Sequence, residues 1–175
     1  LVLAKAEGPY LSEVPAGVRV IDLHSSRVLF SLPRLVCYLR RERPQALLST
    51  LDHANIVALW ARKLARLPNR LVVRVANNLS QSASSASTAR GRLMPRLIHK
   101  FYPWADAVVA VSQGVADDLV KTARLSRERI QVIYNPVVTP EIVEKAEEPL
   151  NHPWFAPGEP PVILSVGRLT KAKDY

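Results

Sequence analysis

The sequence ends in a glycine followed by basic residues. Residues 161–166 form a short, mostly apolar run rich in β-branched residues, and Gly167, Arg168, Lys171 and Lys173 follow it. A glycine after a strand lets the backbone approach a ligand closely, and fixed cations in the same turn neutralise phosphate groups. These residue types therefore predict a strand at 161–166 that leads into a phosphate-binding loop.

A second candidate region lies in the middle of the chain. Residues 77–91 begin with Asn77 and Asn78, are rich in serine and threonine, and contain Leu79 as their one large apolar residue. This composition predicts a mobile loop. A long loop after a central strand often contacts the acceptor in α/β enzymes, which makes Asn77 and Asn78 candidate cleft residues; a plain linker is the alternative.

Ser112 is a third candidate. It ends an apolar run that starts at Asp106, and residues with helical periodicity begin at Gln113. Serine at this position is typical of a helix N-cap, whose side chain accepts a hydrogen bond from the backbone. The other interpretation is that Ser112 lines a cleft in which an acceptor substrate binds.

Strands must alternate with helices to position these residues. Short apolar runs and helical repeats follow one another along the chain, with short connections. They predict an α/β fold, a Rossmann-like parallel sheet with helices on both faces. The expected strands cover 1–4, 18–23, 46–50, 70–76, 106–112 and 130–134; the expected helices cover 28–39, 56–67, 93–101, a segment from 113, and 140–148. We expect a first domain at 1–150, a linker at 151–160, and a second domain opening at 161–175.

The charge is concentrated in the middle of the chain. The 175 residues carry a net charge of +9, and residues 27–100 contain 14 Lys or Arg against two acids, Glu42 and Asp52. Such an excess suits nucleic acid, an anionic membrane or a phosphorylated substrate, or is merely a solvated surface. We expect no nucleic-acid partner, because the chain has no helix-turn-helix, zinc spacing or aromatic RNA-binding strand. No apolar run reaches the length of about 20 residues needed to span a bilayer.

The expected helix at 93–101 is both amphipathic and basic. Arg92, Arg96 and Lys100 fall on its polar face, which suits peripheral contact with an anionic membrane; an ordinary surface helix is the alternative.

The cysteine and histidine usage argues against a metal site. Cys37, the one cysteine, falls on the apolar side of the expected helix at 28–39, so we predict a packed thiol in a reducing, cytoplasmic compartment. His24, His53, His99 and His152 are scattered without metal-ligand spacing. We therefore expect neither a metal nor another cofactor.

Three segments, taken in order, resemble the retaining glycosyltransferases of family 4. They are DAVVAVSQGVADDL at 106–119, RIQVIYNPV at 129–137 and PPVILSVGRLTKAKDY at 160–175. The resemblance implies a GT-B architecture, in which 1–150 is the acceptor-side domain and 161–175 begins the donor-binding domain. It also implies transfer of a sugar, with retention, from a nucleotide sugar to a glycan or lipid-linked acceptor.

The resemblance assigns roles to individual residues. Arg168 and Lys173 match the cations that hold the donor diphosphate, and Gly167 keeps the loop clear of the donor. His53 is the nearest match to a histidine that contacts the transferred sugar, although a helix cap formed with Asp52 and Asn55, or a plain surface position, is the alternative. Asn135 is expected in the crossover turn, where asparagine tolerates unusual backbone angles.

Two features of the family 4 glycosyltransferases are missing from this sequence, one at each end of the chain. The first strand and its Gly-rich loop would precede Leu1, and the acidic donor motif would follow Tyr175. We therefore expect a fragment that is inactive alone. The other hypothesis is a non-catalytic module that binds a nucleotide, a sugar or a partner protein.

Overall fold

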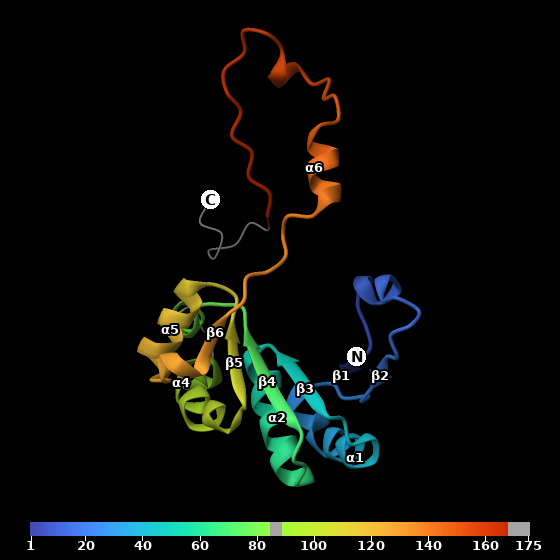
Figure 1. Ribbon diagram of the computed structural model, residues 1–175, viewed down its shortest axis with the longest axis vertical. Helices are drawn as coiled ribbons and strands as arrows, with labels where there is room; N and C mark the ends of the chain where they lie inside the picture. Colours follow the sequence, from blue (N-terminus) through green and yellow to red (C-terminus); the bar gives the residue numbers. More distant parts are fainter. Residues whose placement is uncertain (85–88, 168–175) are drawn as a thin grey trace. The chain divides into compact units, whose positions relative to one another are not determined.

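The computed structural model describes residues 1–84 and 89–167 (Figure 1). The chain divides into two compact units, Leu1–Asn135 and Pro136–Tyr175. The candidate cleft residues His53, Asn77, Asn78 and Ser112 all belong to the first unit. The predicted domain boundary at 150 stays a prediction.

The first unit is built on parallel strands. A four-stranded sheet has the order β3-β4-β5-β6, and a separate parallel pair joins β1 to β2. In the larger sheet, Ser49 lies opposite Val73, Val73 opposite Val108, and Val108 opposite Ile130. The strands are β1 Val2–Leu3, β2 Ile21–Asp22, β3 Ala46–Thr50, β4 Arg70–Val75, β5 Ala107–Ala110 and β6 Ile130–Val132.

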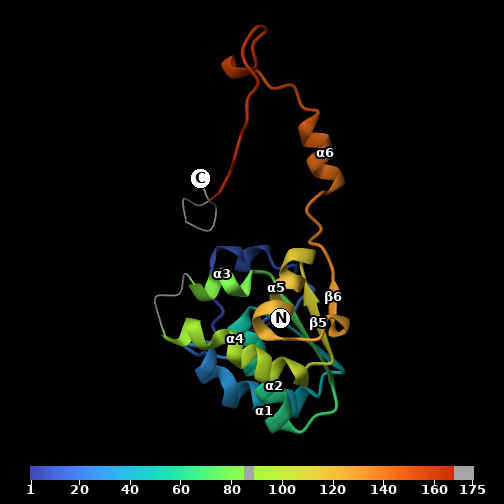
Figure 2. The same cartoon turned by 90° about the vertical axis from the view of Figure 1, so that its left-hand side faces the viewer.

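Helices connect the strands, as parallel pairing requires. Helices α1, α2, α4 and α5 form a row in which each packs on the next (Figure 2). The α-helices are α1 Leu32–Glu42, α2 Asp52–Ala65, α3 Leu79–Ser84, α4 Ala89–Phe101, α5 Gln113–Ala123 and α6 Pro140–Ala146; the 3-10 helices are η1 Pro9–Glu13, η2 Val28–Ser31, η3 Tyr102–Trp104, η4 Arg127–Arg129 and η5 Pro153–Phe155. The predicted class, a Rossmann-like α/β fold with a parallel sheet, is confirmed.

Burial alternates along β4 and identifies its core face. Leu71, Val73 and Val75 are at most 1% exposed and pack with Ile98 of α4 and Leu119 of α5. A second apolar cluster joins α1 to α2. The helical row therefore holds the strands in place, and with them the residues at the strand ends.

The mobile loop predicted at 77–91 is wrong at 79–84 and 89–91, where α3 and the start of α4 lie, and residues 85–88 of that prediction lie outside the described residues. Leu79 is 1% exposed, so the one large apolar side chain of the stretch anchors it in the core. Asp118 of α5 accepts hydrogen bonds from the backbone N–H groups of Leu79 at 2.5 Å and Ser80 at 3.0 Å. These bonds satisfy the free N–H groups at the start of α3, a tertiary contact that local composition does not reveal.

The prediction for Cys37 is also wrong, because its side chain is exposed. Leu35 and Leu39 supply the buried side of α1. Residues two positions apart lie about 200° apart around a helix, so Cys37 points away from Leu35.

In the second unit, α6 confirms the helix predicted at 140–148, but the strand expected at 161–166 is absent. This run is extended and exposed, with Ile163 at 97% and Val166 at 86%. A strand requires a hydrogen-bonding neighbour, and no strand is present within residues 136–167.

Candidate functional site

Most candidate residues lie where the parallel strands of the larger sheet end, and we call this carboxyl-terminal end of the sheet the candidate edge. His53 follows β3, Asn77 and Asn78 follow β4, Ser112 follows β5 and Asn135 follows β6. Because the strands are parallel and adjacent, their carboxyl ends share this edge, where ligands bind in open α/β sheets. Ser112 is partly buried and the other four residues are exposed.

Arg74 of β4 crosses this edge. Its guanidinium donates to Oγ1 of Thr50 at 3.2 Å and to Oδ1 of Asn135 at 2.6 Å. The side chain is half-buried, and its two bonding partners are neutral. Arg74 therefore ties the ends of β3 and β4 to the segment after β6 and adds a positive charge beside the candidate residues.

The expectation for Asn135 needs correction. Its backbone is not among those with positive φ in the described chain, so it adopts no left-handed conformation. The turn uses its side-chain oxygen instead, which accepts the hydrogen bond from Arg74.

His53 lies in the first turn of α2 with an exposed side chain. The expected cap is not present, because the N-cap residue is Leu51 and no side chain bonds there. The neighbouring Asp52 and Asn55 form a different contact: the Tyr102 hydroxyl donates to Oδ1 of Asp52 at 3.3 Å and accepts from Nδ2 of Asn55 at 3.0 Å. The exposed side chain of His53 itself forms no hydrogen bond with another described residue.

Burial controls the ionisation of this cluster. Desolvation raises the pKa of Asp52 above its ordinary value, while the hydrogen bond from Tyr102 and the nearby His53 oppose the rise. Desolvation also raises the pKa of Tyr102, which is 0% exposed, so its hydroxyl stays a neutral donor. The edge therefore presents a carboxyl group with a raised pKa next to an exposed imidazole, groups that bind hydroxyls and exchange protons.

Ser112 caps α5, as predicted. Its Oγ accepts a hydrogen bond from the backbone N–H of Val115 at 3.2 Å. The hydroxyl thereby fixes the start of the helix at the candidate edge.

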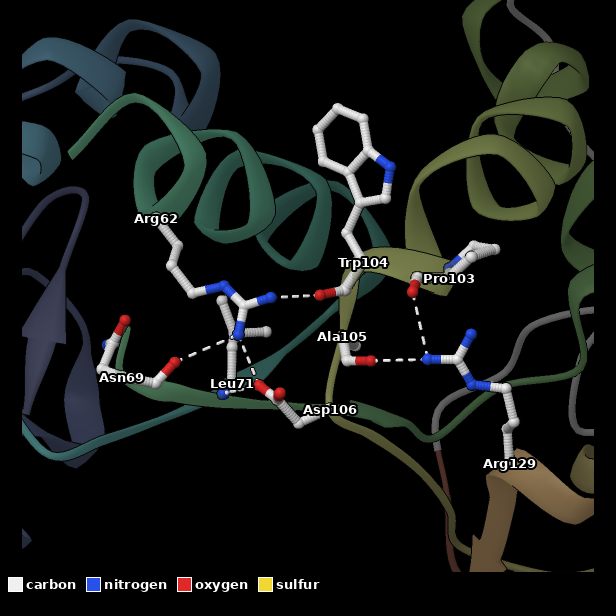
Figure 3. A network of polar contacts seen from close by, with 8 residues as sticks. All are labelled: Arg62, Asn69, Leu71, Pro103, Trp104, Ala105, Asp106 and Arg129. Carbon is white, nitrogen blue, oxygen red and sulfur yellow. Dashed lines mark hydrogen bonds and ion pairs between the residues drawn. The ribbon is translucent and has the colours of Figure 1, made fainter. Parts of the chain in front are cut away.

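A structural ion pair lies where β4 and β5 begin (Figure 3). Arg62 of α2 donates to the Asp106 carboxylate and to the backbone oxygens of Asn69 and Trp104. Asp106 also accepts from the Leu71 N–H at 2.6 Å, and this bond, with the Arg62 charge, holds the Asp106 pKa below its ordinary value. The pair fixes strand starts rather than the candidate edge.

Arg129 supports the same region. It donates to the backbone oxygens of Pro103 at 3.0 Å and Ala105 at 2.8 Å (Figure 3). Two arginines thus satisfy the carbonyl groups of the turn that leads into β5.

The donor-loop candidates lie mostly beyond the described residues. Gly167 is exposed, and Arg168 and Lys173 lie outside the part of the chain that the structure describes. Within that part, no group of three His, Cys, Asp or Glu side chains lies close enough to hold a metal ion. No helix there is long and apolar enough to cross a membrane.

Sequence reasoning did not select Arg74, Asp52, Asn55 or Tyr102 as a connected set. The sequence does offer a way to find Arg74, because this charged residue interrupts the apolar run of β4. The Asn55 to Tyr102 bond joins residues far apart in the sequence, and no local pattern points to it.

The family assignment follows from comparison with known proteins. The model of Glycosyltransferase Family 4 matches residues 2–140. The chain belongs to this family, and its fold is that of the GT-B glycosyltransferases to which it is similar.

One relative is a Campylobacter jejuni enzyme, N-acetylgalactosamine-N,N'-diacetylbacillosaminyl-diphospho-undecaprenol 4-alpha-N-acetylgalactosaminyltransferase. It is 30% identical over 125 residues, which cover 71% of this chain and 32% of the relative.

Two solved structures share the fold. HepE of Anabaena in complex with UDP has a TM-score of 0.51 at 22% identity, covering 74% of this chain and 35% of HepE. The apo form of the lipopolysaccharide outer core galactosyltransferase WaaB has a TM-score of 0.51 at 17% identity, covering 70% of this chain and 32% of WaaB. The chain thus spans about a third of the length of the relatives it matches.

Proposed function

We propose that the chain supplies the acceptor-side domain of a glycosyltransferase. The enzyme would move a sugar from a nucleotide sugar to a glycan or lipid-linked acceptor, with retention of the anomeric configuration. The observation that carries this proposal is the clustering of His53, Asn77, Asn78, Ser112 and Arg74 at one sheet edge in a chain of this family. The acceptor class is supported by the Campylobacter relative, whose name describes a diphospho-undecaprenol acceptor.

The donor diphosphate would bind to the loop at Gly167. In this proposal Arg168 and Lys173 neutralise the diphosphate as it leaves, and Gly167 leaves room for the donor. The UDP bound to HepE supports a nucleotide sugar as the donor class.

The cleft residues would act on the sugar and the acceptor. His53 is exposed after β3 and would contact the transferred sugar, with Asn77, Asn78 and Ser112 lining the acceptor side. Polar side chains at the ends of adjacent strands orient hydroxyl groups by hydrogen bonding.

We propose that sugar transfer uses no metal or other cofactor, and we expect EDTA to leave the transfer rate unchanged.

We also propose that the protein is cytoplasmic and contacts the inner face of the membrane peripherally. The exposed basic residues of α4, Arg92, Arg96 and Lys100, support this contact.

Thermal unfolding of the full-length protein tests the proposal. A ligand that binds the native state alone stabilises it by about 2.7 kcal/mol at a hundredfold excess over Kd. We expect one nucleotide sugar from a panel to raise Tm, while the same free sugar without its nucleotide does not. No shift with any nucleotide sugar would count against the transferase. We expect the 175-residue chain by itself to transfer no sugar.

A further inference from the structure

A pocket lies where β4 and β5 begin, at the opposite end of the strands from the candidate edge, and we call it the amino-end pocket. Its volume is about 340 Å³. Pockets of about 300–1,000 Å³ commonly hold small molecules. The side chains that could bind a ligand here come from α2 and from the turns next to it, and Figure 3 shows four of them; the six are Arg62, Lys63, Arg66, Asn69, Trp104 and Asp106.

Arg62 and Asp106 form the wall of the pocket and neutralise each other. Arg62 donates to the Asp106 carboxylate and to the backbone oxygens of Trp104 and, at 3.1 Å, of Asn69. Asp106 supplies the one carboxylate among the described residues that line the pocket. Its charge is therefore matched before a ligand arrives, and the turns that carry Asn69 and Trp104 are fixed to α2.

Lys63 and Arg66 give the pocket positive charge that no carboxylate neutralises. Both side chains are exposed, and neither forms a hydrogen bond or an ion pair with another described residue. Nζ of Lys63 lies 5.0 Å from the centroid of the Trp104 ring. A cation–π contact at an exposed site is weaker than a charge-assisted hydrogen bond, so a phosphate group would draw the ammonium group away from the ring. Two such cations on one wall suit an anionic ligand.

The side chain of Asn69 is buried at this pocket without a hydrogen-bond partner. Asn69 is 8% exposed and belongs to the lining residues. Neither its Oδ1 nor its Nδ2 bonds to any described residue. A buried amide without partners costs free energy, and in a native structure it points to a ligand or a water that supplies the missing bonds. The adjacent donor and acceptor of an asparagine amide match those on the edge of a nucleobase such as adenine.

Trp104 offers an aromatic ring in the same pocket. The residue is partly buried, and its ring meets that of Phe101 edge to face, at 5.0 Å between centroids and 79° between planes. Any nucleobase can stack on an aromatic side chain, because every base has a π-face. Movement of Lys63 toward a phosphate would uncover the Trp104 ring for such stacking.

We propose that the amino-end pocket binds a nucleoside phosphate. The base stacks on Trp104 and bonds to the amide of Asn69 after a rotation of that side chain, and Lys63 and Arg66 hold the phosphate. None of these residues belongs to the candidate edge or to the proposed donor loop. The inference therefore goes beyond the proposed sugar transfer and holds or fails independently of it.

Isothermal titration calorimetry of the full-length protein tests this site. The protein carries Arg168→Ala/Lys173→Ala, so that the proposed donor loop contributes little to nucleotide binding. The probes are AMP, GMP, CMP and UMP, each titrated separately, and inorganic phosphate. We expect at least one nucleotide to bind with a Kd about tenfold or more below that of inorganic phosphate, because the base adds stacking and hydrogen bonds.

A charge variant of the pocket has a matched control at the end of α5. Lys63→Gln/Arg66→Gln should raise the Kd of the bound nucleotide about tenfold or more, since its phosphate loses two charged partners. Lys121→Gln/Arg124→Gln removes the same charges at the same spacing, and Arg66 and Arg124 both end their helices with left-handed backbone angles, φ 57° and 53°. The control should leave the Kd within about threefold, because charges beyond a Debye length are screened.

Asn69→Leu separates a ligand contact from a structural role. Leucine is close in size and leaves no buried polar group unpaired, so we expect the urea midpoint to stay unchanged or to rise. We also expect the Kd of the nucleotide to rise about tenfold, while the Kd of inorganic phosphate stays the same. A lower urea midpoint with an unchanged nucleotide Kd would assign Asn69 to the fold alone and contradict its place in the site.

Three results would overturn the inference. If the donor-loop variant binds none of the nucleotides, the site does not exist, although a nucleotide sugar could still raise Tm of the wild type. Equal loss of binding in the Lys63/Arg66 and Lys121/Arg124 variants would assign the binding to net charge rather than to the pocket. Inorganic phosphate that binds as tightly as every nucleotide would contradict recognition of a nucleoside.

Discussion

The hydroxyl of Tyr102 donates a hydrogen bond to Oδ1 of Asp52 across 3.3 Å. The bond joins η3 to the first turn of α2, where His53 follows Asp52 in sequence. Tyr102 also accepts from Asn55, whose amide reaches the backbone oxygen of Arg74 at 3.0 Å. A buried tyrosine thus couples the positions of the residues at the candidate edge.

Removal of the Tyr102 hydroxyl should destabilise the protein. Tyr102→Phe deletes two hydrogen bonds in a fully buried position, and we expect the free energy of unfolding to fall by about 1–2 kcal/mol. Urea denaturation measures the change. Tyr38→Phe is the control, because the Tyr38 hydroxyl has no hydrogen bond to a described residue, and it should cost less than about 0.5 kcal/mol. Equal losses in both variants would contradict a specific role for the Tyr102 bonds.

Ionisation of Asp52 should reduce stability as pH rises. Burial raises its pKa above 3.8, so between that value and the raised pKa the folded protein holds the proton more tightly than the unfolded chain does. Stability from this group is present at low pH and is lost as pH rises through the folded pKa. Asp52→Asn removes this loss, and we expect its unfolding free energy relative to wild type to increase from about pH 3 to about pH 7. If the difference in unfolding free energy between Asp52→Asn and wild type does not vary with pH, ionisation of Asp52 does not affect stability.

Asp106 should show the opposite pH dependence. The Leu71 N–H and the Arg62 charge lower its pKa below 3.8, so its contribution is present at neutral pH and is lost as pH falls through the folded pKa. Asp106→Asn should cost about 0.5–1 kcal/mol near pH 7, because solvent screens the half-exposed Asp106 carboxylate, and much less in acid. Urea titrations at several pH values measure this, with exposed Asp117→Asn as the control. A cost that persists undiminished in acid would argue against the charge as its source.

Ser112 should stabilise α5 through its cap. Ser112→Ala removes the bond to the Val115 N–H and should lower the unfolding free energy by about 1 kcal/mol. Ser126→Ala is the matched control, since Ser126 is the N-cap of η4 without a side-chain bond. If the two variants are equally stable, the cap contributes nothing measurable.

The fold was predictable from the sequence because its core strands are short apolar runs between helical repeats. Leu71, Val73 and Val75 alternate with less buried residues in β4, a local pattern that the sequence displays. The helix over 79–84 was not predictable, since it depends on Asp118, which lies in another helix. The run at 161–166 has strand composition but has no strand partner within residues 136–167.

The candidate edge was predictable in part. His53, Asn77, Asn78 and Ser112 each follow a strand, and parallel pairing is enough to bring strand ends together. Arg74 was missed because its partners, Thr50 and Asn135, are far away in sequence. One pocket between α4 and α5 is lined by Arg92, Arg96 and Arg124, which helix packing brings together and which composition records only as an excess of basic residues.

Sugar transfer by the full-length protein is the most direct test of the proposed function. The measurement is release of nucleoside diphosphate from a nucleotide sugar in the presence of lipid-linked acceptor, for wild type, Arg168→Ala/Lys173→Ala and the control Lys121→Ala, an exposed lysine of α5. We predict transfer by wild type and the control, and a loss of about 100-fold or more in the double variant. Undiminished transfer by the double variant, or no transfer by wild type from any nucleotide sugar, would contradict the proposal.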